Sequence, residues 1–315
     1  MLRRRGWQVF QLIIILACST YVLAGLDFDL FFIIISGYNL VAVFIAVLLL
    51  FSGFFALGGR IRSLSDGEIK FSDSIVGTVI GQGANNILPA KLGEVIKAYY
   101  ISRNSSRTMP WVFGLVFWER FFDLNIMLIC GLFIFFAVNP DFPISYFFFM
   151  VLFLWLALYA SFIWKNTLLK FVKYLPFEKL REFIVELIEH LTKGLNGKSI
   201  IKVSIWTILI WLQYVAQVAV ILLWAAELNL SLEAILVIFV VSGIGLNLAV
   251  SPGGIGVYEA AIVVSASWYG VGREEALASA LVLHVIQYVP TTIIGFYFMY
   301  RSNITFSEIK NQVPK

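Results

Sequence analysis

Three charged side chains lie close together inside an apolar stretch of this chain: Glu119, Arg120 and Asp123. In a helix, Glu119 and Asp123 share one face, and Arg120 precedes Asp123 by three residues. Charged side chains in a membrane-spanning segment are unfavourable and usually face the bundle interior, where a functional role is the default interpretation. A guanidinium can bind a phosphate in bidentate fashion. The cluster therefore predicts a site for an anionic group, and the structural alternative is that Arg120 only neutralises Asp123.

Residues 81–94 and 243–259 repeat one pattern: Gly-x-Gly-x-Asn, then a proline, a glycine four residues later, and a glutamate. Proline removes a backbone donor and glycine favours turns, so a helix should break at each site. In lipid, a broken helix persists only where it is buried in protein or lines a cavity. Matching breaks in two halves of a membrane protein therefore indicate a transport site.

Polar residues and glycines beside the two breaks are the other candidate substrate-binding residues. They are Asn85, Asn86, Pro89, Lys91 and Glu94 at the first break, and Asn247, Pro252, Gly253, Gly254 and Glu259 at the second. Backbone amides exposed after each proline could bind an anionic head group, as helix N-termini do. Glu94 and Glu259 each begin the second half-helix. They are therefore either helix caps or ligands for a cation, a proton or a sugar hydroxyl.

One histidine, His284, lies in the last apolar segment. With Glu94 and Glu259 it is a candidate proton relay, because an imidazole inside a membrane can pass protons. The alternative is a polar contact that holds helices together.

The composition is strongly apolar, with 60% hydrophobic residues and 13% charged residues. That charged fraction is about half of the share usual in soluble proteins. The net charge of +4 comes from basic residues in short loops, which is the positive-inside bias of membrane proteins and not a nucleic-acid-binding signature. Both cysteines lie in apolar segments, so neither a disulfide nor a zinc site is expected.

Enzyme signatures are missing from the sequence. It contains no phosphate-binding loop ending in Gly-Lys-Ser/Thr, no His-Glu-x-x-His zinc pair and no Gly-x-Ser-x-Gly. We therefore expect no cofactor and no metal, and neither an ATP-driven pump nor a soluble-type hydrolase.

Six apolar segments are predicted to span the membrane: 7–26, 38–57, 111–138, 144–164, 199–226 and 276–300. The first follows three arginines and resembles a signal peptide, but its length predicts an uncleaved span. Regions 71–103 and 231–269 contain the two breaks, and each is predicted to be a re-entrant hairpin of two half-helices. Four ordinary spans are the alternative.

The charges of the loops predict an orientation. Basic residues concentrate in loops 58–70 and 165–198, after the first hairpin and in the C-terminal tail, whereas loops 27–37, 139–143 and 227–233 contain no Lys or Arg. The basic loops and both termini are therefore placed in the cytoplasm. The two hairpins then have opposite topology, as in an inverted repeat.

Within the second basic loop, segment 176–193 has apolar residues at helical spacing with charges opposite them. It is predicted to be an amphipathic helix on the cytoplasmic membrane surface. A connector packed on the bundle is the alternative.

Three motifs in order carry a family resemblance: Asn86-Ile-Leu-Pro89-Ala-Lys-Leu-Gly93-Glu94, Glu119-Arg120-Phe-Phe-Asp123 and Ser251-Pro252-Gly-Gly-Ile-Gly256-Val-Tyr-Glu259. With them the chain resembles, over nearly its whole length, the lysylphosphatidylglycerol-synthase transmembrane-region family of flippase-like membrane proteins. The resemblance implies an inner-membrane protein that moves or handles a lipid with a polar head group. In the multiple peptide resistance factor a separate soluble domain makes the aminoacyl-lipid. We expect no such domain here and therefore no synthase activity.

We therefore predict an all-α polytopic membrane protein with a single transmembrane domain over residues 1–315. Its predicted function is that of a lipid flippase or transporter for a phospholipid or lipid-linked sugar in the cytoplasmic membrane. Two alternatives remain: a membrane-embedded partner of a lipid-modifying enzyme or glycosyltransferase, and a transferase that acts on a lipid carrier.

Overall fold

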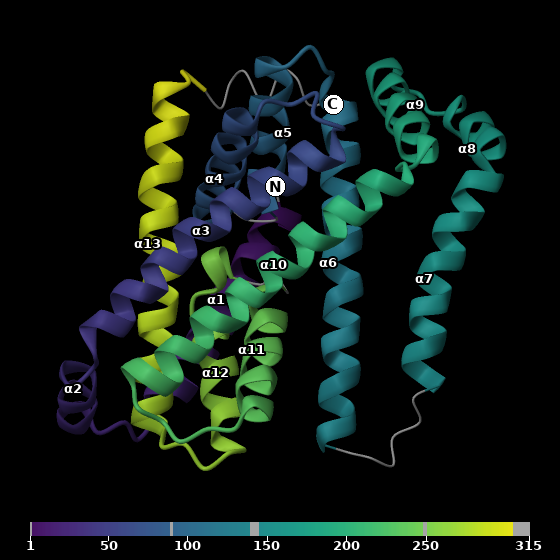
Figure 1. The fold of residues 1–315 in the computed structure, drawn as a ribbon. Coiled ribbons are helices and arrows are strands. Elements are labelled where there is room, and N and C mark those ends of the chain that lie inside the picture. Colours follow the sequence, from purple (N-terminus) through teal and green to yellow (C-terminus); the bar gives the residue numbers. More distant parts are fainter. Residues whose placement is uncertain (1, 89–90, 139–144, 248–250, 305–315) are drawn as a thin grey trace. The chain divides into compact units, whose positions relative to one another are not determined.

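The computed structural model describes residues 2–88, 91–138, 145–247 and 251–304, and every regular element in these ranges is a helix (Figure 1). The helices are α1 (Leu2–Leu23), α2 (Phe28–Ser36), α3 (Leu40–Leu64), α4 (Phe71–Ile87), α5 (Gly93–Asn104), α6 (Met109–Val138), α7 (Ser145–Ile163), α8 (Lys165–Val172), α9 (Glu178–Lys193), α10 (Gly197–Ala219), α11 (Leu232–Asn247), α12 (Val257–Ser267) and α13 (Arg273–Arg301). A π-helical turn, Val220–Ala225, continues α10, and a 3-10 turn, Pro252–Gly254, precedes α12. The predicted all-helical class is confirmed.

Three described helices are long and apolar enough to cross a membrane: α3, α13, and α10 with its π-helical turn. Two bent pairs, α1 with α2 and α7 with α8, raise the number to five if each pair forms one span. About 20 helical residues cross the apolar layer of a bilayer. The chain is thus a multi-pass membrane protein, and the six spans with two re-entrant hairpins stay a prediction.

Two segments predicted as loops contain helices. In loop 27–37, residues Phe28–Ser36 form α2, whose apolar run starts after Asp27. The Asp27 side chain accepts a hydrogen bond of 3.0 Å from the backbone N–H of Leu30, so it caps the helix. In loop 165–198, helix α8 precedes the predicted amphipathic helix. Helix α2 was therefore missed because a single helix cap is a weak signal in an apolar sequence.

The third helix continues through a predicted loop. Gly58 and Gly59 were interpreted as a break, but α3 runs on to Leu64. A Cβ on Gly58 would overlap the Ile75 side chain of α4, and one on Gly59 would lie 2.5 Å from the Trp206 ring of α10. The two glycines therefore permit close helix packing instead of a turn. As a consequence, Arg60 belongs to a helix and is buried.

Both predicted breaks are present. Helices α4 and α5 are separated by residues 88–92, and α11 and α12 by residues 248–256. Gly77 of α4 lies against Ile101 of α5, where an added Cβ would come within 2.7 Å of the Ile101 side chain. Helices α11 and α12 pack along each other, with Gly245 against Ala261 (Figure 1). Each predicted hairpin region is thus a pair of packed helices joined at a Pro/Gly break.

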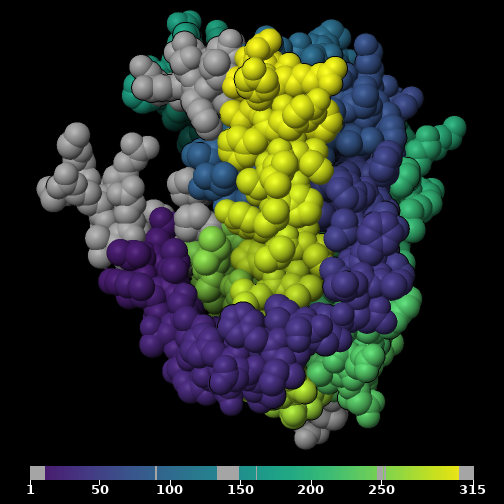
Figure 2. Space-filling model, turned by 90° about the vertical axis from the view of Figure 1, so that its left-hand side faces the viewer, coloured from purple at the N-terminus to yellow at the C-terminus, as the bar shows by residue number. Residues whose placement is uncertain are grey.

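The chain divides into two compact units. Unit 1 comprises Met1–Phe54, Gln82–Gly93 and Ile210–Phe296, and unit 2 comprises Phe55–Gly81, Glu94–Leu209 and Tyr297–Lys315. In unit 1 the purple residues of α1 and α2 lie beside the first half of α13 (Figure 2). There the hydroxyls of Tyr38 and Ser279 share a buried hydrogen bond of 2.8 Å. Each unit contains one group of the candidate residues.

Within unit 2, the amphipathic helix α9 packs against the first turns of α6. The Trp111 and His190 rings lie 4.9 Å apart, and those of Phe113 and Phe183 lie 5.6 Å apart. Burial, with help from the nearby cations Lys193 and Arg107, lowers the pKa of His190, so it packs as a neutral imidazole. The predicted helix is therefore confirmed, and these contacts are those of a connector packed on the bundle.

Candidate functional site

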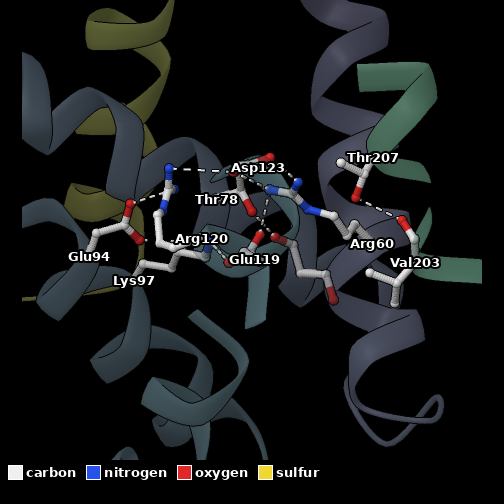
Figure 3. Close-up of polar contacts among 10 residues, drawn as sticks. Arg60, Thr78, Glu94, Lys97, Glu119, Arg120, Asp123, Val203 and Thr207 are labelled. Atoms are coloured by element: carbon white, nitrogen blue, oxygen red, sulfur yellow. Dashed lines mark hydrogen bonds and ion pairs between the residues drawn. The ribbon is translucent and has the colours of Figure 1, made fainter. Parts of the chain in front are cut away.

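Six charged side chains of unit 2 form a closed ring of ion pairs, which we call the charge ring (Figure 3). Three helices position it: α3 contributes one residue, α5 two and α6 three. In ring order the members are Arg60, Glu119, Lys97, Glu94, Arg120 and Asp123. Cations and carboxylates alternate around the ring, so its formal charge is zero.

The inner half of the ring is buried. Arg60 and Glu119 have 1% of their side-chain surface exposed, and Lys97 has 5%. One Glu119 oxygen lies 3.3 Å from Arg60 Nη2, and the other accepts a hydrogen bond of 2.6 Å from Lys97 Nζ. Glu119 therefore joins α6 to both α3 and α5. Removing the Glu119 charge would take one of two anionic partners from each of these buried cations.

The outer half of the ring is accessible. Arg120 is 49% exposed, while Glu94 and Asp123 are 18% and 20% exposed. Arg120 donates a hydrogen bond of 2.9 Å to Glu94 and lies 3.6 Å from Asp123. Glu94 also lies 3.9 Å from Lys97, and Asp123 accepts a hydrogen bond of 2.6 Å from Arg60. Each outer carboxylate thus contacts a second cation besides Arg120.

Two buried hydroxyl groups near the ring are satisfied within their own helices (Figure 3). Thr78 donates to the Ser74 carbonyl and Thr207 to the Val203 carbonyl, each at 2.8 Å. The ring is therefore bordered by side chains whose hydrogen bonds do not depend on it.

The sequence identified four of the six ring residues. It missed Arg60, which was assigned to loop 58–70, and it did not include Lys97 among the candidate residues. The charges in the sequence could have indicated both residues. Glu94, Glu119 and Asp123 supply three negative charges in apolar regions, and Arg120 alone cannot neutralise them. Two further cations were required because unpaired charges are strongly disfavoured in apolar surroundings.

A second polar site lies in unit 1, at the break before α12. Glu259, in the first turn of α12, uses one oxygen to accept a hydrogen bond of 2.8 Å from the Gly256 N–H. Its other oxygen contacts Nδ1 of His284, on α13. The second ring nitrogen of His284, Nε2, lies 3.0 Å from the Gly253 carbonyl oxygen. Both side chains are buried, so the structure brings together two of the three residues of the predicted relay.

The two breaks meet in unit 1. Tyr288 of α13 donates a hydrogen bond of 3.2 Å to the Asn86 carbonyl, and Asn86 donates one of 2.8 Å to the Thr292 hydroxyl. A Cβ on Gly253 would lie 2.9 Å from the Asn86 carbonyl oxygen and would overlap the Tyr288 ring. At a φ of +62°, Gly253 also has a backbone conformation that favours glycine. The second break therefore packs directly on the last turn of α4, next to the first break.

The remaining predicted residues have more local roles or lie outside the described structure. Asn85 accepts a hydrogen bond of 2.7 Å from the Gly93 N–H and so caps α5. Lys91 is half-buried in the turn before α5 at a φ of +54°, and Gly254 has a φ of +80°. Three predictions fall outside the described parts: Pro89 as a whole, and the side chains of Asn247 and Pro252.

Comparison with known proteins places the chain in a family. The family model described as the lysylphosphatidylglycerol synthase TM region matches residues 8–295. The chain belongs to this family. It is also 26% identical over 244 residues to the UPF0104 membrane protein MJ1078 of Methanocaldococcus jannaschii, an alignment that covers 72% of this chain and 98% of that protein. The charge ring and the two breaks all lie inside the matched region.

Proposed function

We propose that this protein binds a membrane lipid with a phosphate-bearing head group and moves it across the cytoplasmic membrane. The observation that carries the proposal is the half-exposed Arg120 on the outer half of a ring that is otherwise buried or half-buried. A guanidinium binds phosphate through two parallel hydrogen bonds, which makes Arg120 the natural phosphate ligand. The basic loops orient the proposed transporter with both termini in the cytoplasm.

The ring is built so that Arg120 can exchange its partners. When a phosphate binds Arg120, Glu94 keeps its contact with Lys97, and Asp123 keeps its hydrogen bonds with Arg60. Neither carboxylate is then left without a cation, so the main energetic penalty of opening a buried ion pair is avoided. The two released carboxylate oxygens can accept hydrogen bonds from head-group amines or hydroxyls. A zwitterionic or hydroxylated phospholipid head group has a phosphate for Arg120 and hydrogen-bond donors for Glu94 and Asp123.

Family membership supports the same class of substrate. Lysylphosphatidylglycerol, named in the family description, has one phosphate and a lysyl group with amines. Its phosphate matches Arg120, and its amines match Glu94 and Asp123. Because the apolar helices of this chain provide lipid-facing surface, the acyl chains can stay in the bilayer while the head group passes.

A liposome assay with purified protein tests the proposal. The probes are phosphatidylglycerol and lysylphosphatidylglycerol with a fluorophore on one acyl chain, and a membrane-impermeant reductant reports their movement between leaflets. We expect Arg120→Gln to slow movement about tenfold or more, because a charge-assisted hydrogen bond contributes about 1.5–3 kcal/mol. Arg120→Lys, which keeps the charge and loses the fork geometry, should be intermediate.

Arg62→Gln is the matched control, because Arg62 is an exposed arginine of α3 outside the ring. It should move lipid at the wild-type rate. Monodisperse gel-filtration profiles of all variants would separate loss of function from loss of folding. Wild-type rates in both Arg120→Gln and Glu94→Gln would contradict the assignment of the ring as the head-group site.

A further inference from the structure

We infer that Glu259 and His284 form a proton-binding site, and that its proton drives or gates the lipid movement proposed above. The assignment of a proton to the pair rests on geometry alone, while its link to lipid rests on the proposed function. We call these two residues the Glu259–His284 pair.

Hydrogen-bond geometry fixes the number of protons that the pair holds. The Gly253 carbonyl can only accept, so His284 Nε2 at 3.0 Å must carry a hydrogen. On the other side, Nδ1 contacts a carboxyl oxygen of Glu259. A bare nitrogen and a bare carboxylate would direct lone pairs at each other, so one more proton lies between them. The pair is therefore neutral as a whole, and loss of the shared proton would leave one buried negative charge.

The surroundings of the pair make that proton exchangeable. The other titratable groups that face it are Tyr258 and Tyr288, whose rings pack edge-on against the imidazole, and Cys18 of α1, beside Gly256. Within the described residues, Glu259 forms no ion pair with a lysine or arginine. The charge ring differs, since its carboxylates contact Arg60 and Arg120, which stay charged at any accessible pH. The cationic partner of Glu259 is the imidazole of His284, which becomes neutral when it loses a proton.

The proton also holds the second break together. Through one carboxyl group and one imidazole, the pair connects the Gly256 amide, the Gly253 carbonyl and α13. Gly253 in turn packs on Tyr288, which donates to Asn86 of the first break. Loss of the shared proton would leave one N–H on the imidazole for its two acceptors, so either the contact with Glu259 or the hydrogen bond to the Gly253 carbonyl would be lost. The protonation state of one pair therefore acts on both breaks.

The proton count can be measured directly because the chain has two histidines. In a His190→Gln background, His284 is the only histidine, and 15N-histidine labelling gives its ring signals alone. The protein would be reconstituted in bilayers and followed by solid-state NMR, with infrared detection of a protonated carboxyl group, from about pH 5 to about pH 9.

We expect the pair to hold two protons at neutral pH, one on Nε2 and one shared between Nδ1 and Glu259. Glu259→Gln should abolish the carboxyl signal and leave His284 with Nε2 protonated alone at neutral pH. Glu227→Gln, at an exposed glutamate elsewhere in unit 1, should match the parent. A wild-type pair that holds only one proton at neutral pH, or a Glu259→Gln variant with the parent's proton count, would overturn the proton site.

Coupling is tested separately in liposomes with an imposed pH gradient, using the acyl-labelled phosphatidylglycerol probe. Wild-type movement should change several-fold when the gradient is imposed, whereas Glu259→Gln should respond less than twofold. Wild-type movement that ignores the gradient would overturn the coupling while the proposed function stands. If no lipid moves at all while the pair holds its two protons, the proposed function fails and the proton site stands.

Discussion

Glu119 differs from the other carboxylates of the charge ring because it is fully buried and both its cation partners belong to other helices. Its two partners come from different helices, α3 and α5, so the residue holds three helices at one point. Arg120, one position later, is half-exposed. Adjacent residues of α6 therefore have different surroundings, with Glu119 enclosed by the ring and Arg120 on its accessible side.

Neutralising Glu119 should destabilise the protein more than any exposed charge change. Glu119→Gln leaves Asp123 as the anion beside Arg60 and Glu94, at 3.9 Å, as the anion beside Lys97, and removing one partner from a buried ion pair costs about 3–5 kcal/mol. The exposed control Arg62→Gln should change stability by less than about 0.5 kcal/mol. Thermal unfolding in one detergent, with Lys97→Met added to Glu119→Gln as a partial rescue, measures both. Equal unfolding temperatures for Glu119→Gln and wild-type protein would contradict the buried bridge.

The sequence predicted the ring incompletely for a physical reason. Glu94, Glu119, Arg120 and Asp123 were recognised because a charge in an apolar stretch is costly wherever the chain folds. Arg60 was missed because its neighbours Gly58 and Gly59 resemble a turn in sequence. Only tertiary packing against Ile75 and Trp206 shows that the glycines are helical.

At the scale of elements, glycine has two opposite uses in this chain. Gly253 has a positive φ at a break, whereas Gly59 lies in the interior of α3. The Gly/Pro repeat located both breaks from sequence, because the effects of proline and glycine on the backbone are local. The same reasoning failed at α3, where a close neighbour and not the backbone requires glycine. Element prediction was therefore reliable at breaks with proline and weaker at glycines alone.

An alanine substitution distinguishes these uses in α3. In an open helix interior, Gly→Ala stabilises by about 0.5–1 kcal/mol. At Gly59 the new Cβ would lie 2.5 Å from the Trp206 ring, so we expect Gly59→Ala to destabilise by about 1–3 kcal/mol. Gly197→Ala, at the start of α10 with no atom within 4 Å, is the control and should be neutral or slightly stabilising. A higher unfolding temperature for Gly59→Ala would show that α3 and α10 do not pack as described.

At the scale of the whole molecule, the carboxylates of the two units are paired with different kinds of cation. Unit 2 balances its acids with arginines and a lysine, which suits a site that exchanges one anion for another. Unit 1 balances Glu259 with a histidine, which suits a site that gains and loses a proton. A transporter needs both a substrate site and a source of free energy or a gate. In the proposed transporter, the head-group site would belong to unit 2 and the proton site to unit 1.

The separation predicts that substrate retention depends on the ring and not on the pair. Lipids that copurify with the protein in mild detergent should include one enriched phospholipid or glycolipid, identified by mass spectrometry. We expect Arg120→Ala to reduce that lipid about tenfold or more, since the phosphate loses its bidentate ligand. Arg62→Ala should retain it.

Glu259→Gln should also retain the lipid, because the variant changes a proton site and leaves every ring residue in place. The combined result then locates head-group recognition in unit 2 and proton binding in unit 1. An unchanged bulk lipid profile in wild-type protein and Arg120→Ala would argue against the ring as the recognition site. Equal loss of the lipid in Arg120→Ala and Glu259→Gln would contradict the division of tasks, because one site would then control both steps.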